Sequence, residues 1–444
     1  MEDNKYLFTN KQLSKLLVPL VIEQLLSITV GLADSIMVSS VGESAVSAVS
    51  LVDSIMILLI NIFAALATGG AVIAGQYIGK KKLDKACKAG EQLILFVSVF
   101  SLVIMILMYL FKRFILTVVF GSIDLDVMNY CNTYLLIVSL SIPFIALYNA
   151  GAALFRIMGN SKISMNTSLL MNGINVVGNA ICIYVIHMDV AGVAIPTLIS
   201  RIVASVVIIN LLKNTKLTIH FTNEFKFKFD KKMIKSILSI GIPNGVENSM
   251  FQLGKIILLS LIATFGTASI TANAVSNAVA CFEILPGLAL GMGLITVISR
   301  CVGAKEYGQV RYYTRKLMKI AYLSMIIINI IMILLLPLIV KIYGLSDITS
   351  KMTKELLILH GICASLIWPL SFCLPNTLRA ANDAKYTMII GVFSMWIFRI
   401  VCGYVLGKYL GFGVFGVWVA MIIDWIVRAI FFIIRYKGNS WIKV

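Results

Sequence analysis

Residues 19–42, PLVIEQLLSITVGLADSIMVSSVG, form a long apolar segment that contains two carboxylates, Glu23 and Asp34. Residues 243–266, PNGVENSMFQLGKIILLSLIATFG, repeat its outline and keep the proline, the first acid and the last glycine. Leu258 stands where the second acid would be. An ionised carboxylate is costly in hydrocarbon, so an acid within such a segment is by default a functional hypothesis. The comparison predicts a duplicated chain in which Asp34 belongs to one half alone.

The composition of the whole chain is typical of a helical membrane protein. Hydrophobic residues make up 59% of its 444 residues and charged residues 13%, whereas an average soluble domain is about 25% charged. Mean hydropathy is +0.96, and apolar segments of about 20 residues or more, enough to span a bilayer, recur from end to end. We predict an all-α membrane protein with twelve transmembrane helices. The predicted spans are 13–38, 46–78, 88–111, 128–156, 163–187, 190–212, 235–264, 270–300, 312–340, 353–380, 385–407 and 412–434.

Positive charge is distributed unevenly between these spans. The net charge is +18, and Lys and Arg gather in alternate connections, for example around 80–88, 213–235 and 300–316. The opposite connections, such as the one that contains Asp189, are poorer in them. The positive-inside rule accounts for this pattern without any nucleic-acid partner. It predicts a multi-pass protein of the plasma or inner membrane with both termini in the cytoplasm.

An internal repeat divides the chain. A shift of 224 residues, the repeat offset, carries Pro19 to Pro243 and Gly192 to Gly416. Each half holds six predicted spans, so both halves begin on the same side of the membrane. Parallel repeats of this kind are a secondary-transporter architecture. We predict a first lobe at 1–212, a basic cytoplasmic linker at 213–234 and a second lobe at 235–444; contact of the linker with anionic lipid heads is a second interpretation of its charge.

Four polar side chains of the first half are candidates for a cation site. Asp34 lies late in the first span, Asn175 and Asn179 lie four residues apart on one face of the fifth, and Thr197 lies early in the sixth. Carboxylate, amide and hydroxyl oxygens suit a hard cation such as Na⁺, and a carboxylate also takes up H⁺. Two plainer interpretations stay open. Asp34 would reach interfacial water near the end of its span, and the Asn and Thr side chains would make ordinary hydrogen bonds between helices.

Glu23 and Glu247 are equivalent by the repeat and fall near the cytoplasmic ends of spans one and seven. Because both halves keep this acid, a shared role in gating or packing is one interpretation. Contact of each with headgroup water is the other.

Four further charges fall inside predicted spans of the second half and could form two pairs. They are Lys255 with Glu283, and Arg399 with Asp424. Paired intramembrane charges are often structural, although such residues also mark transport pathways.

No motif predicts an enzyme, a metal site or a bound cofactor. The eight cysteines and three histidines lack metal-ligand spacing, and the sequence contains no Walker A, HExxH or GxSxG motif. An ion gradient should therefore supply the energy for transport. A channel is disfavoured because channels are usually shorter and oligomeric.

Several motifs, taken in order over nearly the whole chain, resemble the multidrug and toxic compound extrusion (MATE) transporters. In the first half they are GLADSIMVSSVGESAVSAVSL (31–51), GGAVIAGQYIGKKKLDKA (69–86), FRIMGNSKISMNTSLLMNGINVVGNAICI (155–183) and AGVAIPTLISRI (191–202). In the second half they are GIPNGVENSM (241–250), LRAANDAKYTMIIGVFSMWIFRI (378–400) and GFGVFGVWVAMIIDWIVR (411–428).

This resemblance implies two six-helix lobes that form a V-shaped cavity, and a monomeric antiporter that works by rocking one lobe on the other. Family members export cationic or amphipathic small molecules in exchange for H⁺ or Na⁺. Asp34 matches the aspartate of the family's cation site in the first lobe, and Asn175, Asn179 and Thr197 match its other polar members. A related flippase for lipid-linked sugars is the alternative, although such proteins tend to carry several central arginines.

The chain departs from the family pattern at two places. Asn179 stands where many members have an aspartate, so the site would have a single carboxylate. Phe251 stands where members of the NorM-like branch have an acid in span seven, and CLPNTLRA (373–380) in span ten also lacks one. The chain therefore resembles the DinF-like branch more closely, which leaves Asp34 as the leading coupling residue.

Overall fold

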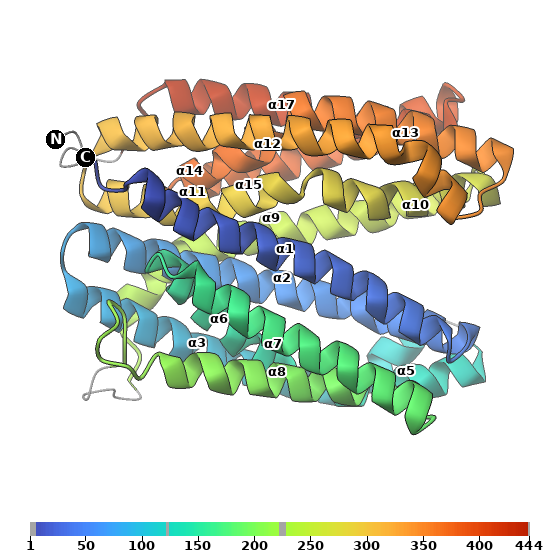
Figure 1. Cartoon of the computed structure of the whole chain (residues 1–444), viewed down its shortest axis with the longest axis horizontal. Helices are drawn as coiled ribbons and strands as arrows, with labels where there is room; N and C mark the ends of the chain where they lie inside the picture. The colour runs from blue at the N-terminus through green and yellow to red at the C-terminus, as the bar shows by residue number, and fades with distance from the viewer. Residues whose placement is uncertain (1–5, 121–123, 222–227, 443–444) are drawn as a thin grey trace. The chain divides into compact units, whose positions relative to one another are not determined.

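The computed structural model describes residues 6–120, 124–221 and 228–442, and within these ranges the secondary structure is helical, without strands (Figure 1). Ten of the described helices are long and apolar enough to cross a membrane. Two further pairs of helices, each bent at a short break, raise the number to twelve when each pair is counted as one span. These findings confirm the predicted all-α class with twelve membrane helices.

Packing divides the chain into two compact units. The first unit is Asn10–Gly245, and the second contains residues 246–442 together with residues 6–9. The boundary falls inside one helix, α9 (Lys231–Ala263). The short N-terminal stretch joins the second unit because the Phe8 backbone N–H donates to the Tyr313 hydroxyl at 2.8 Å, and this hydroxyl donates to the Phe8 carbonyl at 2.8 Å.

The first unit contains the following elements before it reaches α9. They are α1 (Asn10–Ser39), α2 (Glu43–Gly79), α3 (Leu83–Leu110), α4 (Lys112–Phe114), η1 (Ile115–Val119), α5 (Leu125–Leu140), α6 (Ile142–Ile157), α7 (Ser161–Ala180), η2 (Ile181–Val185) and α8 (Ala191–Leu211), where η marks a π-helical segment. Helix α7 packs against both α1 and α8, and this arrangement joins the first, fifth and sixth predicted spans.

The second unit continues from α9 through the following elements. They are α10 (Thr267–Glu283), α11 (Leu285–Gly303), α12 (Tyr307–Ile342), α13 (Asp347–Leu366), η3 (Pro369–Cys373), α14 (Leu374–Ala380), α15 (Ala384–Phe393), η4 (Ser394–Val401), α16 (Cys402–Tyr404), η5 (Val405–Tyr409) and α17 (Gly413–Lys437). Helix α17 packs against α13 and against η4 and η5, so the last predicted spans of the chain lie next to span ten.

Three predicted spans are interrupted, and a proline lies at each interruption. The span at 128–156 is α5 and α6, which bend by 45° just before Pro143. The span at 353–380 bends by 60° where α13 gives way to η3 at Pro369. The span at 270–300 breaks between α10 and α11, just before Pro286. A proline lacks the N–H that would continue the helical ladder, so the helix restarts at each of these points.

Close packing within the first unit depends on small residues. A Cβ at Gly69 of α2 would lie 2.5 Å from the Ile237 carbonyl oxygen and 2.8 Å from the Gly241 nitrogen, both in the first half of α9. No side chain fits there, so the glycine allows the two backbones to touch. Such contacts between small residues are a common way for helices to associate in lipid.

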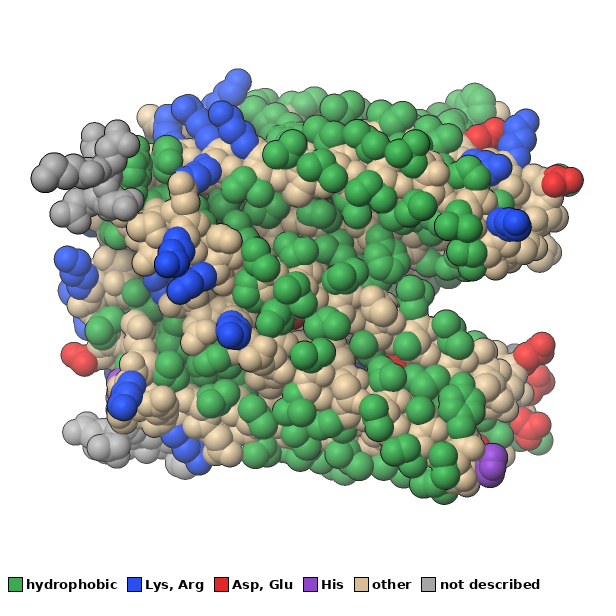
Figure 2. Space-filling model, viewed as in Figure 1, with side chains coloured by type: hydrophobic (Ala, Val, Ile, Leu, Met, Phe, Trp, Pro, Cys, Tyr) green, Lys and Arg blue, Asp and Glu red, His purple; other side chains and the backbone are tan. Residues whose placement is uncertain are grey.

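The surface separates apolar flanks from charged ends. In each unit, apolar side chains cover the long sides of the helices. Lys and Arg side chains gather toward one end of the first unit and lie at both ends of the second (Figure 2). Part of the predicted basic linker, residues 222–227, lies outside the described residues. The part that follows is anchored, since Lys88 Nζ lies 2.6 Å from the Asp230 carboxylate and the Asp230 N–H donates to Gln92 at 2.8 Å.

Candidate functional site

Asp34 lies in the last third of α1 and faces α7. The Nδ2 of Asn179 donates a hydrogen bond to its Oδ1 at 2.8 Å. Asn179 is completely buried, whereas Asp34 is only partly buried. The second side-chain atom of this amide, Asn179 Oδ1, has no hydrogen-bond partner among the described residues. A buried oxygen without a donor is costly unless another positive group satisfies it.

The amide of Asn175 lies between the same carboxylate and Thr197. With its nitrogen toward Asp34, it donates to the two carboxylate oxygens at 2.9 and 3.1 Å, and its oxygen accepts from Thr197 Oγ1 at 3.0 Å. The opposite orientation would set an amide oxygen against the carboxylate oxygens, so electrostatics favour this one. The packing of α7 between α1 and α8 thus brings together all four side chains that the sequence singled out in the first half.

Three more polar side chains, Asp53, Tyr134 and Arg201, complete this cluster, and the sequence analysis missed them. Asp53 of α2 accepts a hydrogen bond from the Tyr134 hydroxyl at 3.1 Å, and Arg201 of α8 donates to Ser141 Oγ at 2.7 Å. Asp53 and Arg201 both interact electrostatically with Asp34. The sequence could have identified Asp53 in the same way as Asp34. It is an intramembrane acid of the first half, and the repeat offset carries it to the uncharged Asn277.

Glu23 is buried and paired within the first unit. Arg156 Nη1 lies 3.1 Å from its Oε1, and Ser164 Oγ donates to its Oε2 at 2.9 Å. Arg156 lies in the last turn of α6 and reaches inward to this acid, a contact that the sequence analysis did not predict. This buried arrangement excludes the interpretation in which Glu23 contacts headgroup water.

Glu247 has an equivalent partner in the second unit. Arg379 Nη2 of α14 lies 2.7 Å from Glu247 Oε2, and Arg428 Nη1 of α17 lies 3.8 Å from Oε1. The two acids are therefore paired with arginines from corresponding helices, since Arg156 and Arg379 end the fourth and tenth spans. This agreement extends the repeat from sequence to side-chain pairing.

Arg399 and Asp424 face each other, as the sequence analysis suggested, but the contact is loose. Arg399 Nη1 lies 3.6 Å from Asp424 Oδ2, whereas Arg428 Nε donates to Asp424 Oδ1 at 2.8 Å. The Ser394 hydroxyl donates to the same Oδ1. Asp424 is thus chiefly the partner of Arg428.

The suggested pair of Lys255 with Glu283 is wrong. Glu283 ends α10 and forms a short hydrogen bond with His360 Nδ1 of α13, because α10 packs directly against α13. Lys255 instead lines a cavity of the second unit. Among the described residues, no group of three or more His, Cys, Asp or Glu side chains is placed to hold a metal ion.

Comparisons with known proteins agree with the repeat and the fold. The model of the MatE family matches residues 19–181 and 243–405, two stretches that are related by the same repeat offset. An uncharacterized transporter of Bacillus subtilis, YisQ, is 29% identical over 434 residues, which cover 96% of this chain and 93% of YisQ. The probable multidrug resistance protein YoeA of the same organism is 24% identical and covers 92% and 89%.

Solved structures resemble the whole chain. A MATE transporter in complex with MaL6 superposes with a TM-score of 0.91 at 20% identity, covering 98% of this chain and 97% of that one. An outward-facing multidrug resistance transporter of the MATE family gives a TM-score of 0.88 at 20% identity, with the same coverage. At this identity the likeness concerns the fold alone. Because the family model covers most of the chain, in both halves, the chain belongs to the MatE family of transporters.

Proposed function

We propose that the protein is an antiporter that exports small organic molecules while H⁺ or Na⁺ enters at Asp34. One observation carries the proposal, the carboxylate of α1 that is held by two amides of α7 at 2.8–3.1 Å. The names of relatives support the substrate class, since YoeA is described as a probable multidrug resistance protein. Membership of the MatE family supports transport as the activity.

The donor set suits the exchange of one small cation. An ionised Asp34 accepts hydrogen bonds from both amides, whereas a protonated Asp34 is itself a donor and must find an acceptor. Asn179 Oδ1, which lacks a partner among the described residues, is a nearby candidate for that acceptor. For Na⁺, the same oxygen, the carboxylate and the Thr197 hydroxyl offer the oxygen ligands that a hard cation prefers.

Cation binding at this position would change how α1 packs. Asp34 is tied to α7, whereas Pro19 interrupts the hydrogen-bond ladder earlier in the same helix and allows it to bend. We propose that the loss of negative charge loosens the bond between α1 and α7, and that the two lobes then rock to expose the substrate to the other side. The energy comes from the H⁺ or Na⁺ gradient, and it is coupled to export because the two states bind the cation with different affinities.

The remaining assignments of the proposal rest on the sequence. Both termini and the basic linker at 213–234, between lobes at 1–212 and 235–444, lie on the cytoplasmic side by the positive-inside rule. Phe251 in place of an acid puts the chain nearer the DinF-like branch than the NorM-like one. We expect the protein to act as a monomer and to need no cofactor besides the coupling ion.

Efflux from proteoliposomes tests the coupling site. Purified protein is reconstituted, and export of the fluorescent cation ethidium is followed under an imposed pH gradient or an imposed Na⁺ gradient. We expect one gradient to drive export by the wild type and Asp34→Asn to abolish it. Asp126→Asn, which neutralises an exposed acid at the start of α5, is the matched control and should export like the wild type. Full gradient-driven export by Asp34→Asn would overturn the assignment.

A further inference from the structure

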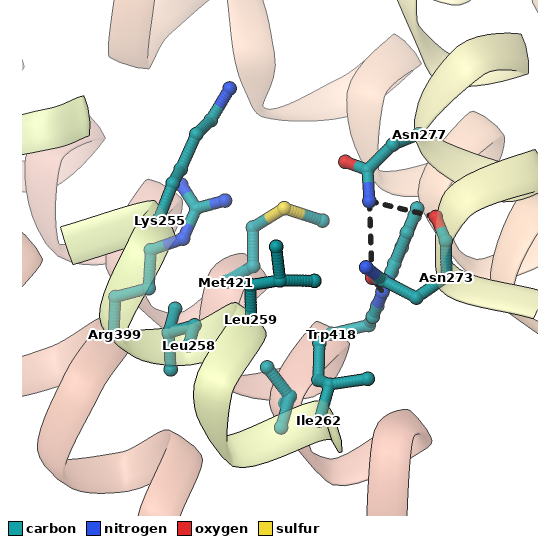
Figure 3. A pocket seen from close by; sticks show the side chains of 10 residues that line it. Lys255, Leu258, Leu259, Ile262, Asn273, Asn277, Arg399, Trp418 and Met421 are labelled. Atoms are coloured by element: carbon teal, nitrogen blue, oxygen red, sulfur yellow. Dashed lines mark hydrogen bonds between the residues drawn. The ribbon is translucent and has the colours of Figure 1, made fainter. Parts of the chain in front are cut away.

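The second unit contains a cavity of about 290 Å³ between its membrane helices. Figure 3 shows Lys255 of α9 and Arg399 of η4 close together on one side, and Asn273 and Asn277 of α10 on the other. Apolar side chains, among them Leu258 and Leu259, also line the cavity. Its volume is near the lower end of the range for small-molecule sites, roughly 300–1,000 Å³.

This cavity is the counterpart of the Asp34 cluster under the internal repeat. The repeat offset carries three of the four side chains that the sequence singled out onto residues that line the cavity, and the fourth onto a residue that touches one of them. Asp34 becomes Leu258, Asn175 becomes Arg399, Thr197 becomes Met421, and Asn179 becomes Gly403. A Cβ on Gly403 would lie 2.9 Å from Leu258 Cδ2, so this pair keeps the contact that Asn179 makes with Asp34.

The sign of the charge is reversed between the two equivalent places. Both acids of the first cluster are lost, because Leu258 replaces Asp34 and Asn277 replaces Asp53. Two cations are gained, because Arg399 replaces Asn175 and Lys255 takes the position of Gly31, and one is lost, because Trp425 replaces Arg201. A place that presents carboxylates to a cation in one half thus presents an ammonium and a guanidinium group in the other.

The surrounding protein neutralises the positive charge at the cavity only in part. Among the described residues, no carboxylate lies within the 4.0 Å of an ion pair to Lys255. Arg399 reaches Asp424 only at 3.6 Å, and its Nε has no hydrogen-bond partner in the described part of the chain. The nearest acid is already bound by Arg428 at 2.8 Å.

An aromatic ring also lies next to these charges. The Phe251 ring centroid lies 5.1 Å from Lys255 Nζ and 5.0 Å from Arg399 Cζ. Cation–π contact offsets part of the cost of placing cations in the membrane, but it leaves their charge in place. An unneutralised cation in a membrane helix is costly, so the cavity is suited to a ligand that brings negative charge.

We infer that this cavity binds the anionic group of an amphiphile, a carboxylate, sulfonate or phosphate. Lys255 and Arg399 pair with the anion, and Leu258, Leu259 and Met421 contact the apolar body. The anionic amphiphile is then a substrate class of the exporter, a step that rests on the proposed function. The amide groups of Asn273 and Asn277 accept or donate hydrogen bonds at the far wall. Two sources share this chemistry, a free amphipathic anion and the headgroup of an anionic membrane lipid.

A pair of fluorescent probes that share the dansyl group and carry opposite charges tests the inference. Dansylglycine carries a carboxylate and dansylcadaverine an ammonium group, and the binding of each to protein in phosphatidylcholine liposomes is measured at equilibrium, without a gradient. We expect wild-type protein to bind dansylglycine more tightly. Lys255→Met should weaken dansylglycine about tenfold, the effect of losing one charged contact. Lys351→Met, at an exposed position of α13, is the matched control and should bind like the wild type.

Charge reversal keeps the test independent of a simple loss of folding. Lys255→Glu should exchange the preference of the protein from dansylglycine to dansylcadaverine, which a misfolded protein would not do. A wild-type preference for dansylcadaverine, or equal binding of dansylglycine to wild type and Lys255→Glu, would overturn the inference.

Lipid composition separates the two sources of the anion. When phosphatidylglycerol replaces part of the phosphatidylcholine, a lipid headgroup in the cavity competes with dansylglycine in the wild type. In that case the affinity of the wild type for dansylglycine falls toward that of Lys255→Met. If the cavity binds free amphiphiles instead, the ratio of the two affinities does not change. Surface charge of the liposome acts equally on both proteins and cancels in the ratio.

The outcome is distinguishable from failure of the proposed function. Binding of dansylglycine that depends on Lys255, without any gradient-driven export, would leave the anion site standing and remove the antiporter assignment. Gradient-driven ethidium export that depends on Asp34, without any dansylglycine binding, would do the reverse.

Discussion

Asn179, completely buried in α7, donates a hydrogen bond of 2.8 Å to Asp34 in α1. This bond connects the fifth span of the chain to the first and crosses 145 residues of sequence. It orients the acid that the repeat marks as specific to the first half. A substitution at Asn179 should therefore change the hydrogen bonding and orientation of Asp34 and leave the carboxylate itself in place.

Asn179→Leu should retain the fold and impair coupled export. The substitution removes the donor and leaves the carboxylate with fewer hydrogen bonds, a loss worth about 1–3 kcal/mol at a buried site. We expect gradient-driven ethidium efflux to fall about tenfold or more. Asn172→Leu, on the same helix but outside the cluster, is the control and should retain most of the rate. Equal rates in both variants would separate Asn179 from the coupling site.

The effects of removing Glu23 and Arg156 on the stability of the protein should not be additive, because the two charges form a pair. Their charges lie 3.1 Å apart inside the first unit, and removing one partner of a buried pair leaves the other charge uncompensated, at a cost of roughly 3–5 kcal/mol. We expect Glu23→Gln and Arg156→Met each to lower the thermal unfolding midpoint in detergent. The double variant should lose less than the sum of the two. Additive losses would show that the pair is not energetically coupled.

Gly69→Ala should destabilise the first unit. The new Cβ would lie 2.8 Å from the Gly241 nitrogen and 2.5 Å from the Ile237 carbonyl oxygen, and neither backbone atom can move without shifting α9. Such overpacking costs about 1–3 kcal/mol. Gly173→Ala in α7 is the control, because its Cβ would meet nothing within 4 Å and alanine favours helix. Thermal unfolding should rank Gly69→Ala below wild type and Gly173→Ala at or above it.

The first turn of α9 should become less stable in acid, because the Asp230 carboxylate that accepts its hydrogen bonds becomes protonated. A hydrogen bond from Lys88 and another from the Met233 N–H lower the pKa of this carboxyl below its usual 3.8. The ionised form therefore stabilises the folded state above that value, and the contribution is lost as pH falls through the lowered pKa. Hydrogen exchange of the Lys232 and Met233 amides, corrected for intrinsic rates, should rise in Asp230→Asn at neutral pH.

The same measurement in acid gives the sign of the effect. The difference between Asp230→Asn and wild type should shrink as pH falls below the lowered pKa of Asp230, where both side chains are uncharged. Asp347→Asn, in the first turn of α13, should leave the exchange at the start of α9 unchanged. A constant difference across the pH range would exclude titration of Asp230 as the cause.

The internal repeat identifies some residues of the candidate cation site from the sequence alone. Asp34 stood out because its equivalent is Leu258, and Asn175 and Asn179 stood out because four residues make one helical turn. Asp53 follows the same rule, because its equivalent is the uncharged Asn277. Arg156 and Arg379 lie at the ends of their predicted spans, and nothing in hydropathy shows that they turn inward.

The sequence by itself determined that this chain is a duplicated helical membrane protein of twelve spans in the MatE family, because span length, loop charge and a constant repeat offset are properties along the chain. Only the tertiary structure decided which charges meet. Glu283 pairs with His360 and leaves Lys255 to the cavity, because α10 packs against α13. Such pairings depend on how each helix is rotated about its axis and which neighbours it packs against, and contacts between residues far apart in sequence set both.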